Sequence, residues 1–270
     1  MAEGRLIQHH GEAIVLRTWP FHEADLLVSL FTRDQGRVKG VARHAMRSRK
    51  RFGGALEPAT QVVAHYTERP GQELVRLDSF EILWSPMTAP VDALRLAGLQ
   101  LVVEVLEEAM PELAADDNIF RLAVTVLQGL GIREQGLGMS GIWLPITYFC
   151  LWMNRLMGWM PELGHCAACG LDLRGPDSRN QPVWWSPTAD GVTCADDRRP
   201  QSRSLSAASV AESARIARTP LPELAAEDWP AERSADLRAF AIGTLERHLE
   251  RRLRSAAMLE HSQLLHGRGA

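Results

Sequence analysis

The chain up to Trp84 follows the two-residue period of β-strands. Apolar and polar side chains alternate along Leu74–Asp78, and Leu26, Val28 and Leu30 fall on one face of a predicted strand. Proline, glycine and aspartate separate these runs, as is typical of turns. The pattern predicts five strands: Glu12–Trp19, Leu26–Arg33, Gly36–Arg43, Gln61–Glu68 and Glu73–Leu83.

Five strands within about 80 residues suit an OB-fold, a partly open barrel that binds oligonucleotides on one face. An SH3-like barrel satisfies the same strand count, so the pattern leaves both barrels open. We expect this barrel domain to span residues 1–84.

After Pro86 the apolar positions change to the helical period. Val91–Met110 carries apolar residues three or four positions apart, which predicts a helix. Asp116 or Asp117 is placed to cap a second helix that stops at Gly131. Further helices are predicted over Pro145–Met157, Ser206–Arg218 and Ala235–Met258, the last with a single apolar stripe that runs to Leu253.

These elements predict a multidomain α+β protein. An N-terminal barrel is followed by a helical domain in two parts, residues 85–162 and residues 201–270. Between the two parts, residues 163–200 break the helical pattern and contain three of the four cysteines. We expect this segment to be an insertion that resembles a zinc knuckle.

The cysteines of the insertion have the spacing of metal ligands. Cys166-Ala-Ala-Cys169-Gly matches a zinc knuckle, in which two thiolates lie on a tight turn. A zinc ribbon needs a second pair, and the chain offers Cys194 and Asp197, although structural zinc sites prefer Cys and His to a carboxylate. Three interpretations stay open: one structural zinc, a degenerate knuckle that folds without metal, and a redox-active cysteine pair. Cys150 lies on a predicted helix and is interpreted as a core residue.

Composition indicates a globular protein, since hydrophobic residues make up 46% and charged residues 23% of the 270 residues. No apolar run reaches the roughly 18 to 20 residues that span a bilayer. Met1–Gly11 lacks the basic-then-apolar pattern of a signal peptide. We therefore expect a cytoplasmic protein that makes no contact with a membrane.

The segment Arg33–Arg51 is strongly basic, although the whole chain carries a formal net charge of -3. Most basic side chains alternate along Gly36–Arg43, which places them on one face of a strand. Phosphate backbones are the usual partners of such a segment, because neutralising phosphates releases condensed counterions. Phe52, which follows the segment, either stacks on a base or packs inside the barrel. The candidate DNA-binding residues are Arg37, Lys39, Arg43, Arg47, Arg49, Lys50, Arg51 and Phe52.

The sequence lacks the motifs of several enzyme classes. It contains no G-x-x-x-x-G-K-[ST], no G-x-G-x-x-G after a strand, no H-E-x-x-H and no G-x-S-x-G. Acidic residues in the strand region are scattered, so no two-metal nuclease site is indicated. We therefore expect a protein that is not an enzyme and that has no nucleotide cofactor.

Several segments, taken in order and spacing, match one family across nearly the whole chain. In the strand region they are Glu12–Leu16, Glu23–Asp25, Leu30–Thr32, Gly36–Arg43 and Leu56–Pro58. Downstream they are Phe149–Leu156, Gly158, Pro161 and Cys166–Gly170. Together they resemble the bacterial recombination mediator RecO. The sequence departs from the zinc-binding members at Asp197, where those carry a fourth cysteine, and some members have lost the ligands altogether.

The resemblance implies an OB-fold, a helical domain and a knuckle-like insertion. It also implies a role as a mediator of DNA repair and homologous recombination in the RecF pathway. Such a mediator binds single- and double-stranded DNA, anneals complementary strands and helps to load RecA onto DNA covered by single-strand-binding protein (SSB). The implied partners are RecR, the acidic C-terminal tail of SSB and, indirectly, RecA, and the implied location is the cytoplasm with its nucleoid.

Functions of other classes are also compatible with the residues. A protein–protein adaptor would use the acidic helical domain and would need no affinity for DNA. A nucleic-acid enzyme with an unrecognised active site would turn over DNA or RNA. An RNA-binding barrel is a third alternative, because an OB-fold contacts backbone and base faces that both polymers share.

Overall fold

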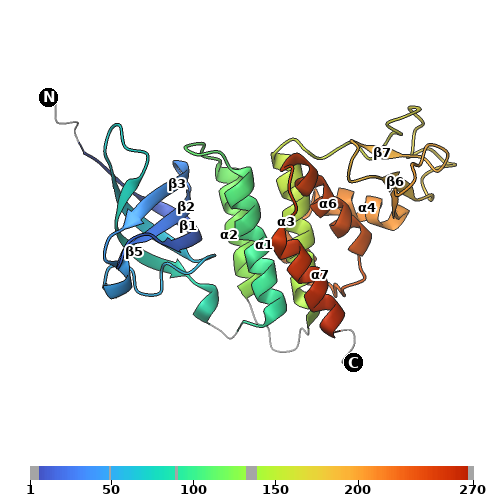
Figure 1. Cartoon of the computed structure of the whole chain (residues 1–270). Helices are drawn as coiled ribbons and strands as arrows, with labels where there is room; N and C mark the ends of the chain where they lie inside the picture. The colour runs from blue at the N-terminus through green and yellow to red at the C-terminus, as the bar shows by residue number, and fades with distance from the viewer. Residues whose placement is uncertain (1–5, 49, 89–90, 132–138, 267–270) are drawn as a thin grey trace. The chain divides into compact units, whose positions relative to one another are not determined.

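Five strands close into a barrel at the start of the chain (Figure 1). In this computed structural model the order is β1-β2-β3-β5-β4, with β3 and β5 parallel and the other neighbours antiparallel. This is a Greek-key barrel of the OB type, so the OB-fold prediction is confirmed. The structure describes residues 6–48, 50–88, 91–131 and 139–266. The strands are β1 (Ile7–Pro20), β2 (Leu26–Thr32), β3 (Gly36–Ala42), β4 (Gln61–Glu68) and β5 (Val75–Trp84).

One apolar core fills the barrel because inward and outward residues alternate along its strands. On β3, Val38 and Ala42 are buried, whereas Arg37 and Lys39 alternate with them on the outer face. Full burial of one large apolar side chain stabilises the fold by roughly 1.5 to 3 kcal/mol. The core includes Ala13, Val15, Val28, Leu30, Val38, Val62, Tyr66, Leu77 and Phe80.

Within the described residues, three helices belong to the same unit as the barrel, and this unit comprises Met1–Arg133 and Leu253–Ala270. Asp92 caps the first of them by accepting a hydrogen bond from the Arg95 amide. Asp116, one of the two predicted caps of the second, accepts a hydrogen bond from the Ile119 amide. The helices are α1 (Ala93–Ala109), α2 (Asp117–Gly131) and α7 (Arg254–His266), and 3-10 turns lie at Ala45–Arg47 and Pro86–Thr88.

The second unit comprises Glu134–Arg252. Helix α3 packs on α6, and the buried amide of Asn154 connects them by donating to the carbonyls of Cys150 and Ala241. Cys150 is fully buried, as predicted. The helices are α3 (Trp143–Leu156), α4 (Ala207–Ile216), α5 (Leu221–Leu224) and α6 (Ala235–His248), after a 3-10 turn at Met139–Ile142. A small antiparallel sheet contains β6 (Val183–Trp185), β7 (Val192–Thr193) and β8 (Arg203–Leu205).

One predicted helix is wrong. The apolar stripe predicts a continuous helix over Ala235–Met258, but α6 ends at His248 and a separate helix, α7, begins at Arg254. Glu250 lies between them with a φ of 54°, in the left-handed region that commonly ends helices. The two helices also belong to different units, so the apolar stripe of the sequence serves two separate cores.

The predicted fold class, a barrel followed by helices with a cysteine-containing insertion, is confirmed. The domain boundaries that the sequence predicts, after residues 84, 162 and 200, remain predictions. The two units divide the chain between Arg133 and Glu134 and again between Arg252 and Leu253. Within the described ranges, no helix is both long enough and apolar enough to cross a membrane.

Candidate nucleic-acid interface and metal centre

The basic residues on β3 are held by acids of the same unit. The Arg37 guanidinium lies 3.2 Å from the Glu107 carboxylate and donates to the Met110 carbonyl, and its side chain is only 16% exposed. Lys39 pairs with Glu112 at 2.8 Å, and this hydrogen bond holds the pKa of that carboxyl below its usual range. These two predicted DNA-binding residues therefore fasten the loop between α1 and α2 to the barrel.

Three further cations of the predicted set lie beyond β3 and are exposed to solvent. Arg43, Arg47 and Lys50 form no ion pair with an acid in the part of the chain that the structure describes. Arg49, the fourth cation predicted for this loop, lies outside the described residues. Exposed cations without a carboxylate partner are the groups that an incoming phosphate can neutralise.

Arg51 differs from its neighbours because its guanidinium donates hydrogen bonds to other residues of the same loop. It donates to the Ser48 hydroxyl at 3.1 Å and to the Arg43 carbonyl at 2.5 Å. It also lies over the ring of Phe52, 5.1 Å from the ring centre. Arg51 thus fixes the path of the loop that carries the exposed cations.

Phe52 packs inside the barrel, which is one of its two predicted alternatives. Its side chain is 2% exposed, and its ring meets the edge of Phe80 with the ring centres 5.5 Å apart. The stacking alternative is wrong, because a base cannot reach the face of a ring that the core covers.

Two exposed apolar side chains, one on the turn before β2 and one on the loop that carries these cations, were not predicted as site residues from the sequence. Phe21, in the turn between β1 and β2, is 42% exposed, and Met46, in the loop after β3, is 64% exposed. The Met46 amide donates to the Ala24 carbonyl, so the two loops are joined. The sequence offers one weak signal, an aromatic residue directly after Pro20 in a predicted turn, and this signal does not reveal exposure.

The predicted metal ligands come together in the second unit. The Cys169 and Cys194 sulfurs are 3.9 Å apart. One Asp197 oxygen lies 3.2 Å from the sulfurs of both Cys166 and Cys194. Tetrahedral zinc with bonds of about 2.3 Å to sulfur requires sulfurs about 3.8 Å apart, which is close to the distance between Cys169 and Cys194, so this set of donor atoms could hold a metal ion. Ligand atoms that lie within 4.8 Å of one another come from Cys166, Cys169, Cys194 and Asp197.

The surroundings of the cluster shift the pKa of Cys166 and of Asp197 downward. Burial opposes ionisation of Cys166, but hydrogen bonds from backbone amides, including that of Cys194, outweigh burial and lower the pKa of this thiol. Hydrogen bonds donated by the thiols, that of Cys169 first, lower the pKa of Asp197. The same contact with Asp197 raises the pKa of Cys169 to about 12. Amides that donate to a ligand sulfur also support a metal thiolate.

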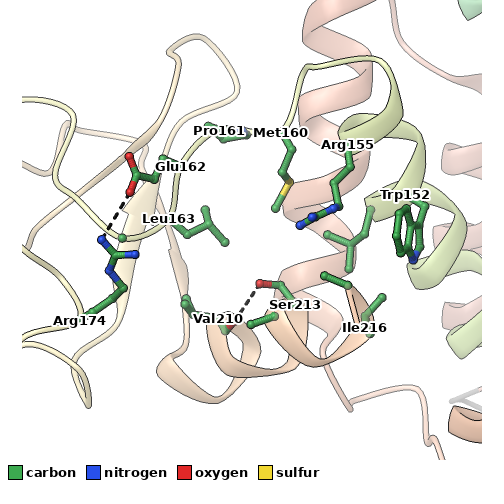
Figure 2. A pocket seen from close by; sticks show the side chains of 14 residues that line it. Trp152, Arg155, Met160, Pro161, Glu162, Leu163, Arg174, Val210, Ser213 and Ile216 are labelled. Atoms are coloured by element: carbon green, nitrogen blue, oxygen red, sulfur yellow. Dashed lines mark hydrogen bonds and ion pairs between the residues drawn. The ribbon is translucent and has the colours of Figure 1, made fainter. Parts of the chain in front are cut away.

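A pocket of about 350 Å³ lies elsewhere in the second unit (Figure 2). Arg155 extends across it from α3, with its guanidinium 5.5 Å from the centre of the Trp152 ring. Arg174, at another side, is already paired with Glu162. The remaining lining is largely apolar and includes Leu163, Met160, Val210 and Ile216.

Comparison with known proteins identifies the family. Residues 6–86 match the N-terminal domain of recombination protein O, and residues 90–257 match its C-terminal domain. The chain belongs to the RecO family. It is 47% identical to DNA repair protein RecO of Koribacter versatilis over 93% of this chain and 97% of that protein. It is 32% identical to DNA repair protein RecO of Anaeromyxobacter sp. (strain Fw109-5) over 92% of this chain and 93% of that protein.

Membership of the RecO family confirms the resemblance found in the sequence and assigns the chain to a family of DNA repair proteins. The geometry adds three features of this chain. They are the exposed cations beyond β3, the cluster of three thiols and one carboxylate that could hold a metal ion, and the largely apolar pocket beside Arg155.

Proposed function

We propose that this protein is a DNA repair and recombination mediator that binds DNA through the loop after β3 and promotes annealing without making or breaking a covalent bond. The observation that carries the proposal is the group of exposed cations Arg43, Arg47 and Lys50, which no described acid neutralises. They stand on an OB-type barrel in a chain whose net charge is -3, so the positive charge is local. We call these three residues the cationic loop.

The physical basis of annealing is charge neutralisation. Two complementary strands repel each other, and a surface that neutralises phosphates of both lowers the cost of their approach. Release of condensed counterions supplies favourable free energy, so the reaction needs neither a nucleotide nor a catalytic residue. Arg37 and Lys39 do not belong to this surface in our proposal, because acids of the same unit occupy them.

The salt dependence of DNA binding tests the cationic loop. Replacing Arg43, Arg47 and Lys50 by Ala should weaken binding of a single-stranded oligonucleotide on the order of tenfold or more, and should lower the slope of log affinity against log salt by about 2, that is about 0.7 for each lost phosphate contact. An unchanged slope in this variant, or an equal change in the control, contradicts the placement. The control removes the same charge from exposed arginines of the second unit, Arg179, Arg199 and Arg218.

Annealing itself is tested with two complementary oligonucleotides, both coated with SSB, in the absence of ATP. The protein should accelerate duplex formation, and the cationic-loop variant should not. Absence of acceleration by the folded wild-type protein would favour the adaptor alternative. Turnover of either oligonucleotide would favour an enzyme.

We also propose that the pocket beside Arg155 receives the acidic C-terminal tail of SSB. A largely apolar pocket with one cation that no described acid neutralises suits a peptide that carries both carboxylates and apolar side chains. Arg155→Glu should weaken binding of a fluorescent tail peptide on the order of tenfold. Arg218→Glu, at an exposed site after α4, should leave it nearly unchanged. Equal affinities of the two variants for the peptide would refute this placement.

The remaining partners in the proposal are RecR and, through it, RecA. They rest on family membership, and a pull-down of purified RecR by this protein tests them directly. We further propose that the four clustered ligands hold one structural zinc, which is supported by the distances between their sulfur and oxygen atoms. Zinc in such a site cross-links the chain and stabilises the local fold.

A further inference from the structure

Two exposed apolar side chains, on the loop after β3 and on the turn joined to it, are not used by the proposed function. Phe21 is 42% exposed and Met46 is 64% exposed, and both stand at turns rather than in a sheet face. Single exposed apolar residues are common on protein surfaces. These two differ because their loops are fastened together and one of the loops carries the exposed cations.

Three hydrogen bonds fix this arrangement. The Phe21 amide donates to the Asp25 carbonyl at 3.0 Å and closes the turn between β1 and β2. The Met46 amide donates to the Ala24 carbonyl at 3.2 Å, and the His44 amide donates to the Asp25 carboxylate at 2.7 Å. The turn after β1 and the loop after β3 therefore form one joined surface.

The chemistry of this surface combines apolar groups with positive charge. Phe21 offers a ring, with the centre of the His22 ring 4.3 Å away, and Met46 offers a flexible thioether. Arg43 and Arg47, on the same loop as Met46, supply the charge. Single-stranded DNA presents unstacked base faces together with phosphates, whereas a duplex hides its base faces in the stack.

We propose that Phe21 and Met46 form a base-contacting subsite that makes this end of the barrel prefer single-stranded over double-stranded DNA. The subsite rests on the proposed function, because the cationic loop holds the phosphates while the two apolar side chains meet the bases. Phe21 takes the stacking role that the buried Phe52 cannot fill. The ligand class is therefore a single strand with unpaired bases.

The test compares affinities of the full chain for a single-stranded oligonucleotide, the same strand without bases, and a duplex of the same length. The variant Phe21→Ala/Met46→Ala should lose about 5- to 150-fold for the single strand, the range expected for one stacked base. Its affinity for the duplex and for the abasic strand should stay nearly unchanged. Its salt slope on the single strand should also stay unchanged, because the phosphate contacts remain.

Two further variants separate the subsite from general damage. Phe21→Tyr keeps a stacking ring and should retain the wild-type affinity for the single strand. Met87→Ala removes a side chain that is 52% exposed on the turn after β5, and it should have no effect on affinity. Thermal unfolding of each variant shows whether the fold is intact.

The outcomes distinguish the subsite from the proposed function. If wild-type protein binds neither single strand nor duplex, the proposed function fails. If it binds both and the double variant loses affinity equally on both, or on neither, the subsite fails while DNA binding stands. Tighter binding to an RNA strand of the same sequence, lost in the double variant, would overturn the assignment to DNA.

Discussion

At the scale of single residues, Glu112 limits the positive charge that the barrel presents. Its carboxylate is 2.8 Å from Lys39 and 3.5 Å from Arg37, and its side chain is 51% exposed. Glu107 keeps Arg37 partnered on its other side. Loss of the Glu112 charge would therefore release Lys39 first.

The variant Glu112→Gln should bind single-stranded DNA more tightly than wild type. Freeing Lys39 for one phosphate should steepen the slope of log affinity against log salt by about 0.7. Glu73→Gln removes the same charge from an exposed residue without an ion pair in the described part of the chain, so it corrects for net charge. Fluorescence anisotropy over a salt series measures both slopes, and equal slopes for the two variants would contradict a specific role of Glu112.

Gly36 determines how closely the loop between α1 and α2 approaches the barrel. Its φ is +74°, and a Cβ there would overlap the backbone of Ala114, at 2.7 Å from its nitrogen and closer still to its carbonyl group. Gly71 has a similar φ of +82°, but a Cβ there would meet nothing within 4 Å. The two glycines therefore separate the cost of backbone strain from the cost of a clash.

Gly36→Ala should lower the free energy of unfolding by about 2 to 4 kcal/mol, because left-handed strain of about 1 to 2 kcal/mol adds to a steric clash. Gly71→Ala should lower it by about 1 to 2 kcal/mol, from strain alone. Urea unfolding followed by circular dichroism measures both values. Equal destabilisation by the two variants would mean that the loop moves away at no cost.

At the scale of elements, local patterns predict the strands well. β4 matches its prediction residue for residue, and β2 and β3 match within one residue, because alternation and turn residues are local signals. The break at Glu250 is not predictable, because apolar residues on both sides of it continue the helical period. The sequence also does not reveal which acids pair with the basic residues of β3, since Glu107 lies 70 positions from Arg37.

The knuckle shows how much a ligand pattern alone establishes. The spacing predicts which side chains meet, and the structure brings all of their ligand atoms within 4.8 Å of one another. The sequence does not reveal that the Cys194 amide donates to the Cys166 sulfur, because this contact depends on how the two turns fold against each other. Phe21 and Phe52 are also indistinguishable in the sequence, since only the path of each loop decides which ring is buried.

Metal analysis of the purified protein should find about one equivalent of zinc per chain, as expected for four ligands around one ion. Cys169→Ser should abolish it and should lower the melting temperature, because the metal cross-link is lost. Cys150→Ala replaces a fully buried cysteine outside the cluster and should retain the zinc. Absence of metal from protein expressed with added zinc would instead identify a degenerate knuckle.

At the scale of the whole molecule, helix α7, near the end of the sequence, belongs to the same unit as the N-terminal barrel. Helix α7 packs on α1, with Leu253 and Leu259 buried to 1% and 3% exposure. Glu104 of α1 accepts hydrogen bonds from the amides of Arg254 and Ser255 at the start of α7. The unit that carries the cationic loop is therefore completed by residues from the far end of the sequence.

Deleting residues 253–270 should destabilise the barrel unit although every barrel residue remains. Exposure of the α1 surface and loss of two buried leucines should cost about 3 to 6 kcal/mol, at roughly 1.5 to 3 kcal/mol for each leucine. Deleting only residues 267–270 leaves α7 intact and serves as the control. Calorimetry should show a lower melting temperature for the longer deletion alone, and a peptide of residues 253–266 added in trans should restore part of it. An unchanged melting temperature would show that the barrel and its first two helices are stable by themselves, and DNA binding by the shortened chain would then be expected to survive.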